Sequence, residues 1–250
     1  FGEKARLIRR LGVDMLLVLN FTPGLAALEA AAFAREVLAE RLQARHVTVG
    51  YNYSFGQGGA GTPETLLTWG KELGFAVTVV PPVLVGGEPV SSSAIRDLLA
   101  QGETAKAAAF LGRWPSVSGR VVAGARRGRE LGFPTANIEL PADLALPRFG
   151  VYAVKTWQGR RSFPGVANVG RVPTFGGGQV RLEVHCFDFR GNLYGKRLRV
   201  ELVAFLRPEQ VFPSPAELKA QMENDAALAR RILSQEGKSS AALVYNERGL

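Results

Sequence analysis

The chain has 250 residues, of which 46% are hydrophobic and 21% charged, as in soluble globular proteins with one large domain or two modest ones. Its apolar runs are far too short to span a bilayer, and no secretory signal pattern is visible. The single cysteine, Cys186, excludes a disulfide framework and a cysteine-based metal cluster, and it fits a cytoplasmic protein.

The formal net charge is +9, and nearly all of the positive excess lies after residue 115. A basic half indicates an anionic partner such as a nucleic acid, a membrane surface or a phosphorylated small molecule. A well-solvated cationic surface explains the same charge, so the choice depends on motifs.

The first half alternates helical and strand patterns, which predicts a parallel α/β sheet. Apolar residues at helical spacing indicate most of the helices, and a Thr62 cap before Pro63 indicates another. Short apolar runs indicate buried strands. The expected helices cover 3–11, 31–42, 63–73, 93–99 and 105–111, and the expected strands cover 15–19, 46–50 and 76–80.

The second half changes to short strands separated by glycine turns, which is typical of a small antiparallel barrel or sandwich. Ser214 and Glu217 form a capping box that opens a final helix to about residue 233. The change falls near 112–115 and predicts an α/β domain at 1–113 and a barrel domain at 116–250. The expected strands cover 117–122, 151–157, 162–169, 180–187 and 196–205.

Residues 56–61 read Gly-Gln-Gly-Gly-Ala-Gly, the glycine spacing of a dinucleotide-binding turn. In that turn the glycines follow a strand directly, and an acidic residue lies about 20 positions further on. Both features are missing from this sequence, so we interpret the run as a loop over a ligand.

Three serines at 91–93 begin a predicted helix one turn before Arg96. Free N–H groups at a helix start bind anions, and an arginine can hold a phosphate with two donors. A plain serine cap with a solvated arginine explains the spacing at least as well.

A basic loop at 124–131 ends on the rigid sequence Pro-Thr-Ala-Asn at 134–137, which we interpret as a stiff turn. Glycines let a backbone approach phosphates closely, and arginines neutralise them. Thr135 and Asn137 offer oxygens suited to a hydrated Mg²⁺, although an exposed hairpin loop explains the composition too. No P-loop pattern occurs. The loop contains Gly124, Arg126, Arg127, Gly128 and Arg129.

Residues 181–187 alternate in polarity, so that Leu182, Val184 and Cys186 share one face of a strand and Glu183 and His185 the other. A carboxylate on a rigid strand can act as the general base for a hydroxyl group. A solvated strand face is the ordinary alternative.

Seven short motifs follow one another through nearly the whole chain, and no single one suffices. Together they resemble the bifunctional bacterial riboflavin kinase/FMN adenylyltransferase family, also called FAD synthetase. They are VGYNYSFG at 49–56, SSSAIR at 91–96, GRELGFPTAN at 128–137, GVANVG at 165–170, PTFG at 173–176, LEVH at 182–185 and LYGK at 193–196.

The resemblance implies an incomplete Rossmann-like nucleotidyltransferase domain, then a Greek-key riboflavin kinase barrel with a C-terminal helix. It implies that the barrel transfers the γ-phosphoryl group of ATP to riboflavin, giving FMN and ADP with Mg²⁺ as cofactor. The parent bifunctional protein would then adenylylate FMN to FAD.

The resemblance also assigns roles to residues. Glu183 would be the catalytic base, and Thr135 and Asn137 would hold Mg²⁺ and the nucleotide phosphates. The remaining assignments are Gly124, Gly128 and Arg129 in a flap over ATP, Ser92 and Arg96 near phosphates, and Asn52 near the flavin.

The chain departs from the family in its first half. A His-x-Gly-His turn binds the nucleotide phosphates there, whereas this chain has only His46 and His185. Ser54, Gln57 and Ser93 stand where the family has arginine, a basic residue and threonine. We expect the missing part to lie before residue 1, and FAD formation by these 250 residues to be weak or absent.

Two alternatives remain: a flavin-binding or regulatory module without catalysis, and a nucleic-acid-binding barrel. Mg²⁺-dependent ATP binding would favour the kinase, and flavin binding without turnover would favour the non-catalytic module. RNA binding that weakens steeply with salt would favour the nucleic-acid-binding barrel. The favoured interpretation involves neither nucleic acid nor membrane, and the sequence leaves the oligomeric state open.

Overall fold

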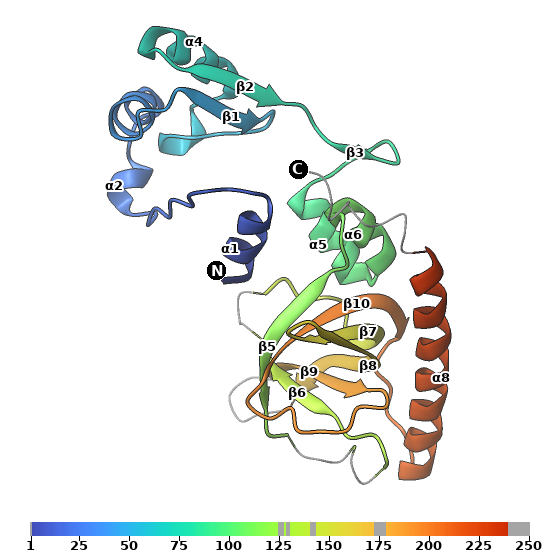
Figure 1. The fold of residues 1–250 in the computed structure, drawn as a ribbon. Coiled ribbons are helices and arrows are strands. Elements are labelled where there is room, and N and C mark those ends of the chain that lie inside the picture. The colour runs from blue at the N-terminus through green and yellow to red at the C-terminus, as the bar shows by residue number, and fades with distance from the viewer. Residues whose placement is uncertain (1, 125–127, 129–130, 141–143, 173–178, 240–250) are drawn as a thin grey trace. The chain divides into compact units, whose positions relative to one another are not determined.

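The computed structural model describes residues 2–124, 128, 131–140, 144–172 and 179–239 (Figure 1). The chain forms two compact units, Phe1–Pro89 and Val90–Leu250. Within the described ranges, no helix is long and apolar enough to cross a membrane.

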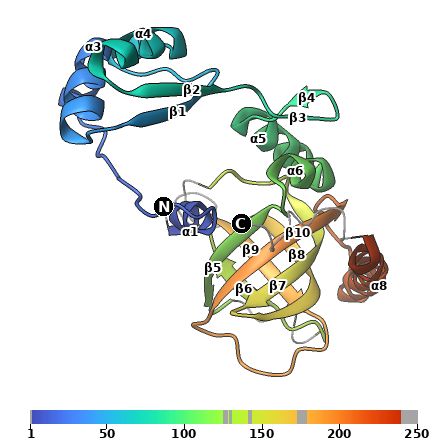
Figure 2. The same ribbon diagram turned by 45° about the horizontal axis from the view of Figure 1, so that its top comes forward.

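The first unit is built around a βαβ motif. Strands β1 (His46–Gly50) and β2 (Ala76–Val80) pair in parallel, and helix α4 (Pro63–Leu73) connects them (Figure 2). Thr62 caps α4 as the sequence predicts, because its hydroxyl accepts a hydrogen bond from the backbone N–H of Thr65 at 3.4 Å. The core of the unit consists of Ala30, Ala34, Val49, Phe55, Leu66 and Phe75.

Two further predicted helices of this unit are confirmed. The first is α1 (Gly2–Arg10), and the second is α3 (Ala30–Ala32) continuing into the π-helix η1 (Phe33–Arg41). The glycine run contains the 3₁₀ turn η2 (Gln57–Gly59), which directly follows Gly56. A Cβ atom added at Gly56 would lie only 2.5 Å from the Cα of Ala30. Close packing therefore requires that glycine. The remaining elements are α2 (Pro23–Ala26), β3 (Leu84–Val85) and β4 (Glu88–Pro89).

The predicted buried strand at 15–19 is wrong. The segment lies in no strand and its apolar side chains are exposed, that of Met15 by 82%. A strand needs a neighbouring backbone edge for its hydrogen bonds, and in the described chain β1 and β2 pair only with each other. The apolar composition indicated burial but could not supply that edge.

The second unit is a closed barrel of six antiparallel strands. They are β5 (Ser116–Val122), β6 (Ala136–Glu139), β7 (Gly150–Gln158), β8 (Arg161–Val172), β9 (Gln179–Cys186) and β10 (Arg197–Arg207). Around the barrel the order is β10-β5-β6-β9-β8-β7. The hairpin-connected strands β7 to β9 with β6 beside β9 make a Greek key, as the family resemblance implies.

The stiff turn predicted at 134–137 is wrong in its second half, because residues 136 and 137 belong to strand β6. Ala136 and Ile138 point into the core, and β6 pairs with β5 on one side and β9 on the other. Ladders on both sides outweigh the low strand propensity of alanine and asparagine. The other five barrel strands are confirmed close to their expected bounds.

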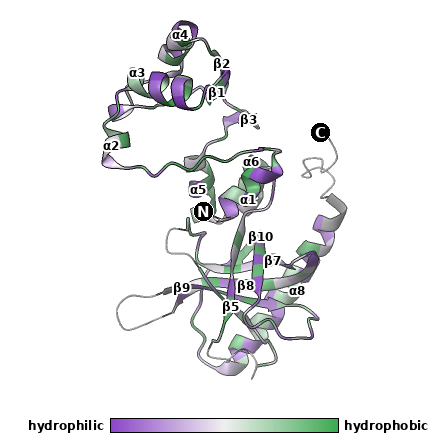
Figure 3. Cartoon of the chain, turned by 60° about the vertical axis from the view of Figure 1, so that its left-hand side comes forward, coloured by the Kyte–Doolittle hydropathy of each residue, from purple (hydrophilic) through white to green (hydrophobic). Residues whose placement is uncertain are grey.

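Alternate residues of the barrel strands point inward, so hydrophobic and hydrophilic colours alternate along them in Figure 3. This alternation fills the interior with aliphatic side chains and places the polar ones on the outer face. The innermost residues, each at most 1% exposed, include Ile138, Tyr152, Val154, Leu182, Val184, Leu198, Val200 and Leu202.

Among the described residues, this unit includes the helices α5 (Ser92–Gln101), α6 (Thr104–Leu111) and α8 (Pro215–Ser239). Helices α5 and α6 were expected in the domain at 1–113 but fall in the second compact unit, where the buried Thr104 hydroxyl donates a hydrogen bond of 2.8 Å to the backbone oxygen of Val203 on β10. Helix α8 begins at the predicted Ser214 cap, whose hydroxyl accepts a hydrogen bond of 3.2 Å from the backbone N–H of Glu217 and donates one of 3.1 Å to the Glu217 carboxylate. The helix packs its apolar side on the barrel.

Candidate active site

Three polar residues lie in a row across neighbouring strands of the barrel. On β9, Glu183 is the register partner of Asn137 on β6 and of Asn168 on β8. Directly paired residues in a sheet emerge on the same face, so the carboxylate lies between two side-chain amides. Leu182 and Val184 point into the core, which leaves this row on the outer face of the barrel, as the alternation predicts.

Asn137 is 5% exposed, and its Oδ1 atom has no hydrogen-bond partner among the described residues. Gly124 makes this burial possible, because a Cβ there would lie 2.2 Å from the Nδ2 atom of Asn137. A buried amide oxygen without a partner is costly unless a ligand or an ion completes it. The site therefore fits an oxygen-coordinated cation or a donor group of a ligand.

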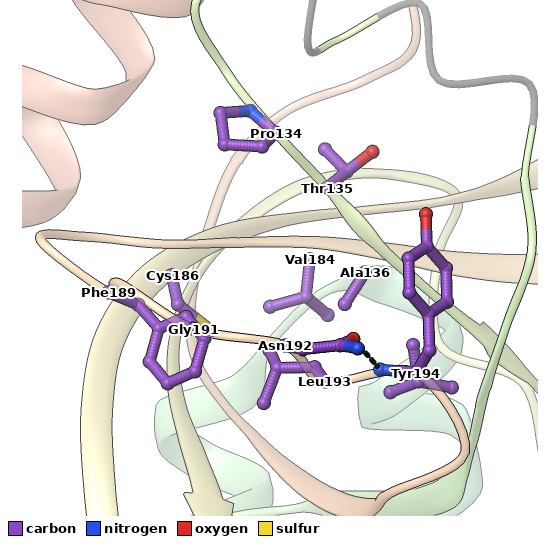
Figure 4. A pocket seen from close by; sticks show the side chains of 11 residues that line it. Pro134, Thr135, Ala136, Val184, Cys186, Phe189, Gly191, Asn192, Leu193 and Tyr194 are labelled. Carbon is purple, nitrogen blue, oxygen red and sulfur yellow. Dashed lines mark hydrogen bonds between the residues drawn. The ribbon is translucent and has the colours of Figure 1, made fainter.

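A cavity of about 450 Å³, the loop-side cavity, opens between the barrel strands and the connection from β9 to β10. Ala136 and Val184 form its floor, and Phe189 and Tyr194 stand at its sides (Figure 4). The connection is held locally, because Asn192 Oδ1 accepts a hydrogen bond of 2.9 Å from the backbone N–H of Tyr194. Its size and its lining of mixed polar and apolar surface suit a small organic ligand.

A second cavity of about 300 Å³, the helix-side cavity, lies on the outer face of the barrel against α8. Asn168, Glu183 and His185 line it from the strands, and Leu218 and Met222 line it from α8. Its walls thus combine an acceptor-rich strand face with an apolar helix face. The site hypothesis had not included α8 at all.

Thr135 borders both cavities. It directly precedes β6, so it lies two residues before Asn137 and one step beyond the pairing of Ala136 with Val184. Of the predicted residues, the structure therefore places Thr135 at the border of both cavities, Glu183 in the wall of the helix-side cavity, and Asn137 beside Glu183 as its register partner. Gly128 lines the helix-side cavity, and its carbonyl accepts a hydrogen bond of 2.7 Å from the N–H of Phe133.

A buried ion pair closes one end of the helix-side cavity. Arg207, the last residue of β10, donates from Nε and Nη2 to the carboxylate of Asp225 on α8 at 2.8–3.1 Å. Gln221 donates to the same carboxylate at 2.8 Å. The two side chains are only 15% and 7% exposed, so their charges offset each other inside the wall. Among the described lining residues, the carboxylates left to face a ligand are those of Glu183 and Glu209.

The single cysteine is not a candidate nucleophile. Cys186 lines the loop-side cavity, and burial raises the pKa of its thiol, against a smaller lowering by the side chain of Thr156. A thiol with a raised pKa stays protonated near neutral pH, and the protonated form is unreactive. Its position on the inner face of β9 makes it part of the cavity wall.

Three other predicted residues, Asn52, Ser92 and Arg96, line neither cavity. Asn52 is exposed in the turn after β1, in the first unit. Ser92 and Arg96 are exposed at the start of α5, where Ser91 caps the helix and Arg96 donates to the hydroxyl of Ser93 at 3.2 Å. The loop arginines Arg126, Arg127 and Arg129 lie outside the described residues.

Sequence reasoning did not single out four residues that complete the site: Asn168, Arg207, Glu209 and Asp225. Asn168 lies within one of the seven motifs, and that motif was its only signal. Its amide donates to the carboxylate of Glu209 at 3.2 Å. The ion pair joins a strand end to a helix 18 residues later, and no sequence pattern marks such a contact.

Comparisons with known proteins agree with the geometry. A riboflavin kinase family model matches residues 111–233, and an FAD synthetase family model matches residues 1–94. The bifunctional riboflavin kinase/FMN adenylyltransferase of Escherichia coli strain K12 is 41% identical over 231 residues, which cover 92% of this chain and 74% of the relative. The protein of that description from Pseudomonas fluorescens is 40% identical over 222 residues, covering 88% and 71%.

A solved structure supports the fold of nearly the whole chain. It is described as a macrolide-efflux protein from Streptococcus pneumoniae, and it matches with a TM-score of 0.83 and 32% identity over 92% of this chain and 74% of that one. The sequence matches and the barrel architecture lead to one conclusion: this chain belongs to the bifunctional riboflavin kinase/FMN adenylyltransferase family.

Proposed function

We propose that the second unit phosphorylates riboflavin with ATP, giving FMN and ADP. Membership of the family supports this activity, and one observation carries it: Thr135 borders two cavities, next to the paired Asn137 and Glu183. Phosphoryl transfer requires that two substrates meet in line and that charge is stabilised, rather than covalent help from the protein. Two cavities that share a polar junction meet the first requirement.

The position of Glu183 assigns the two substrates. A general base must contact the hydroxyl group that it deprotonates, and Glu183 lines only the helix-side cavity. Riboflavin therefore occupies the helix-side cavity, with its ring against the apolar side of α8. ATP occupies the loop-side cavity, and its γ-phosphate reaches Thr135.

In the reaction, the Glu183 carboxylate accepts the proton of the 5′-hydroxyl group as that oxygen bonds to the γ-phosphorus. The bond from the γ-phosphorus to the bridging oxygen of ADP breaks in the same displacement. Asn137 and Asn168 flank Glu183 on the neighbouring strands, and the cavity walls exclude water that would otherwise accept the phosphoryl group.

The residues at the junction fit Mg²⁺. Magnesium binds oxygen ligands and keeps several of its waters, and the buried, unpartnered Oδ1 of Asn137 and the hydroxyl of Thr135 are such ligands. When bound there, Mg²⁺ would neutralise charge on the phosphate oxygens. Gly124 and Gly128 let the loop approach the phosphates, and we assign Arg129 of that loop to charge neutralisation.

We further infer that adenylyl transfer uses Asn52 to bind the flavin, and Ser92 and Arg96 to bind phosphates. The FAD synthetase match over residues 1–94 and the serine-capped start of α5 support this assignment. We place the protein in the cytoplasm, which the free, buried cysteine fits.

The test is a stoichiometric assay with the purified 250-residue chain, ATP, Mg²⁺ and riboflavin. We expect FMN and ADP to form in equal amounts, with no reaction when ATP is omitted. Flavin binding without FMN formation would replace this proposal with a non-catalytic module. Binding to RNA that weakens steeply with salt, without turnover, would favour the nucleic-acid alternative.

A further inference from the structure

His185 connects the strand that carries Glu183 to the segment that carries Thr135. It lies two residues after Glu183 on the same face of β9, and it lines the helix-side cavity. The β6–β9 ladder ends at the pair Ala136 and Val184, and the next step in this register would bring Thr135 opposite His185. The backbone ladder stops where accurate placement of Thr135 matters most.

A side-chain hydrogen bond continues the connection beyond the ladder. The Nδ1 atom of His185 lies 2.9 Å from the backbone oxygen of Pro134. A carbonyl oxygen only accepts, so Nδ1 carries the proton and donates it. Pro134 has a fixed φ, so the tether acts on a stiff residue directly before Thr135.

Two aromatic neighbours fix the orientation of the imidazole ring. Phe133 and Phe187 contact it edge-on, with ring centroids 5.2 Å and 5.8 Å away. Phe133 belongs to the same segment as Pro134, so the ring contact and the hydrogen bond hold one piece of chain at two points. With Nδ1 turned to Pro134, the other ring nitrogen is not needed for the tether.

We infer that His185 is a positioning residue that sets the separation between Thr135 and Glu183. The inference rests on the proposed kinase function, because only there do these two side chains act on the same phosphoryl group. A misplacement of about 1 Å between reacting groups costs a rate factor of roughly 100. Loss of the tether should therefore lower kcat for FMN formation and change riboflavin binding little.

The test compares three variants that differ in where they place an N–H donor. The amide nitrogen of asparagine reaches the place of Nδ1, whereas that of glutamine reaches the place of the other ring nitrogen. We expect His185→Asn to stay within about threefold of the wild-type kcat, and His185→Ala and His185→Gln to lose about 10- to 100-fold. The dissociation constant of riboflavin, measured by flavin fluorescence, should change less than threefold in all of them.

Arg181→Ala is the matched control, because Arg181 lies two residues before Glu183 on the same strand face and lines neither cavity. Its kcat should equal that of the wild type. Equal activity of the asparagine and glutamine variants, or a wild-type kcat for His185→Ala, would overturn the inference. Should His185→Ala not fold, the comparison of asparagine with glutamine still decides. A wild-type chain that makes no FMN would instead refute the proposed function.

Discussion

Asn137 and Glu183 face each other in register on the antiparallel strands β6 and β9, and both project from the outer face of the barrel. The pairing places beside a carboxylate an amide oxygen that has no hydrogen-bond partner among the described residues. If Glu183 is the base, Glu183→Gln should lower kcat for FMN formation by about 100-fold or more, the usual contribution of a general base. The riboflavin dissociation constant should stay within about threefold, because the amide keeps the shape of the carboxylate.

The matched control is Glu201→Gln. Glu201 is a carboxylate on β10 that pairs with Arg199 and lines neither cavity. Its replacement should leave kcat unchanged. Normal turnover by Glu183→Gln would place the base elsewhere.

Gly124→Ala should weaken binding of the nucleotide and not of the flavin. The new methyl group would lie 2.2 Å from Nδ2 of Asn137 and must displace that side chain. We expect the KM for MgATP to rise about tenfold, the equivalent of one charge-assisted hydrogen bond, with riboflavin binding unchanged. Gly2→Ala, where the added Cβ has no neighbour within 4 Å, is the control. An unchanged KM for MgATP would show that Asn137 takes no part in nucleotide binding.

Asp225→Ala should destabilise the second unit and loosen the helix-side cavity. It leaves the guanidinium of Arg207 buried without its carboxylate, which costs about 3 to 5 kcal/mol of unfolding free energy. Urea denaturation measures that loss, and the KM for riboflavin should rise because α8 is no longer fixed to β10. Asp188→Asn is the control: its ion pair with Arg230 is exposed and should contribute little. Equal stability of the two variants would contradict this account.

Tyr152 should make the free energy of unfolding of the barrel fall at alkaline pH. Burial raises the pKa of its hydroxyl to about 12, a positive charge on Arg148 opposes this, and the hydroxyl donates to the backbone oxygen of Arg148. A pKa raised above the unfolded value of 10.0 means that the stabilisation is complete below pH 10 and is lost as the pH rises toward 12. Tyr152→Phe should therefore lose less stability than the wild type between about pH 10 and 12.

Urea unfolding at several pH values tests this prediction, with Tyr51→Phe as the control because the Tyr51 ring is 46% exposed. Parallel stability curves for the wild type and Tyr152→Phe would exclude this role of Tyr152.

The 250-residue chain should form FMN much faster than FAD. The His-x-Gly-His turn of the family does not occur in the sequence, so we expect FMN from riboflavin but little FAD. Chromatography that separates the two flavins measures this, and a second reaction supplied with FMN removes any dependence on the kinase step. FAD formation as fast as FMN formation would show that the adenylyltransferase needs no such turn.

The sequence predicted the elements whose signals are local. The alternation at 181–187 placed Glu183 on the outer face, and the caps at Thr62 and Ser214 began their helices where expected. Strand β6 was missed because its pairing with two distant strands, not its own composition, makes it a strand. The exposed run at 15–19 failed for the opposite reason: its composition indicated a strand, but no strand in the described chain pairs with it.

The candidate site was predicted in part for the same physical reason. Thr135, Asn137 and Glu183 came from residue chemistry and from the family resemblance, and the barrel brings them together. The contribution of α8 and the ion pair of Arg207 with Asp225 depend on how a helix docks on a barrel. Such docking follows from packing over the whole unit, which short motifs do not encode.

The two cavities that meet at Thr135 also bear on the kinetic scheme of the enzyme. Each has its own walls, one between the strands and the β9–β10 connection and one under α8, so neither ligand has to leave before the other enters. Donor and acceptor can be held in one ternary complex, with the phosphoryl group passing between them directly. The reaction then needs no covalent phosphoenzyme. Double-reciprocal plots of initial rate against one substrate, at several concentrations of the other, should give intersecting rather than parallel lines.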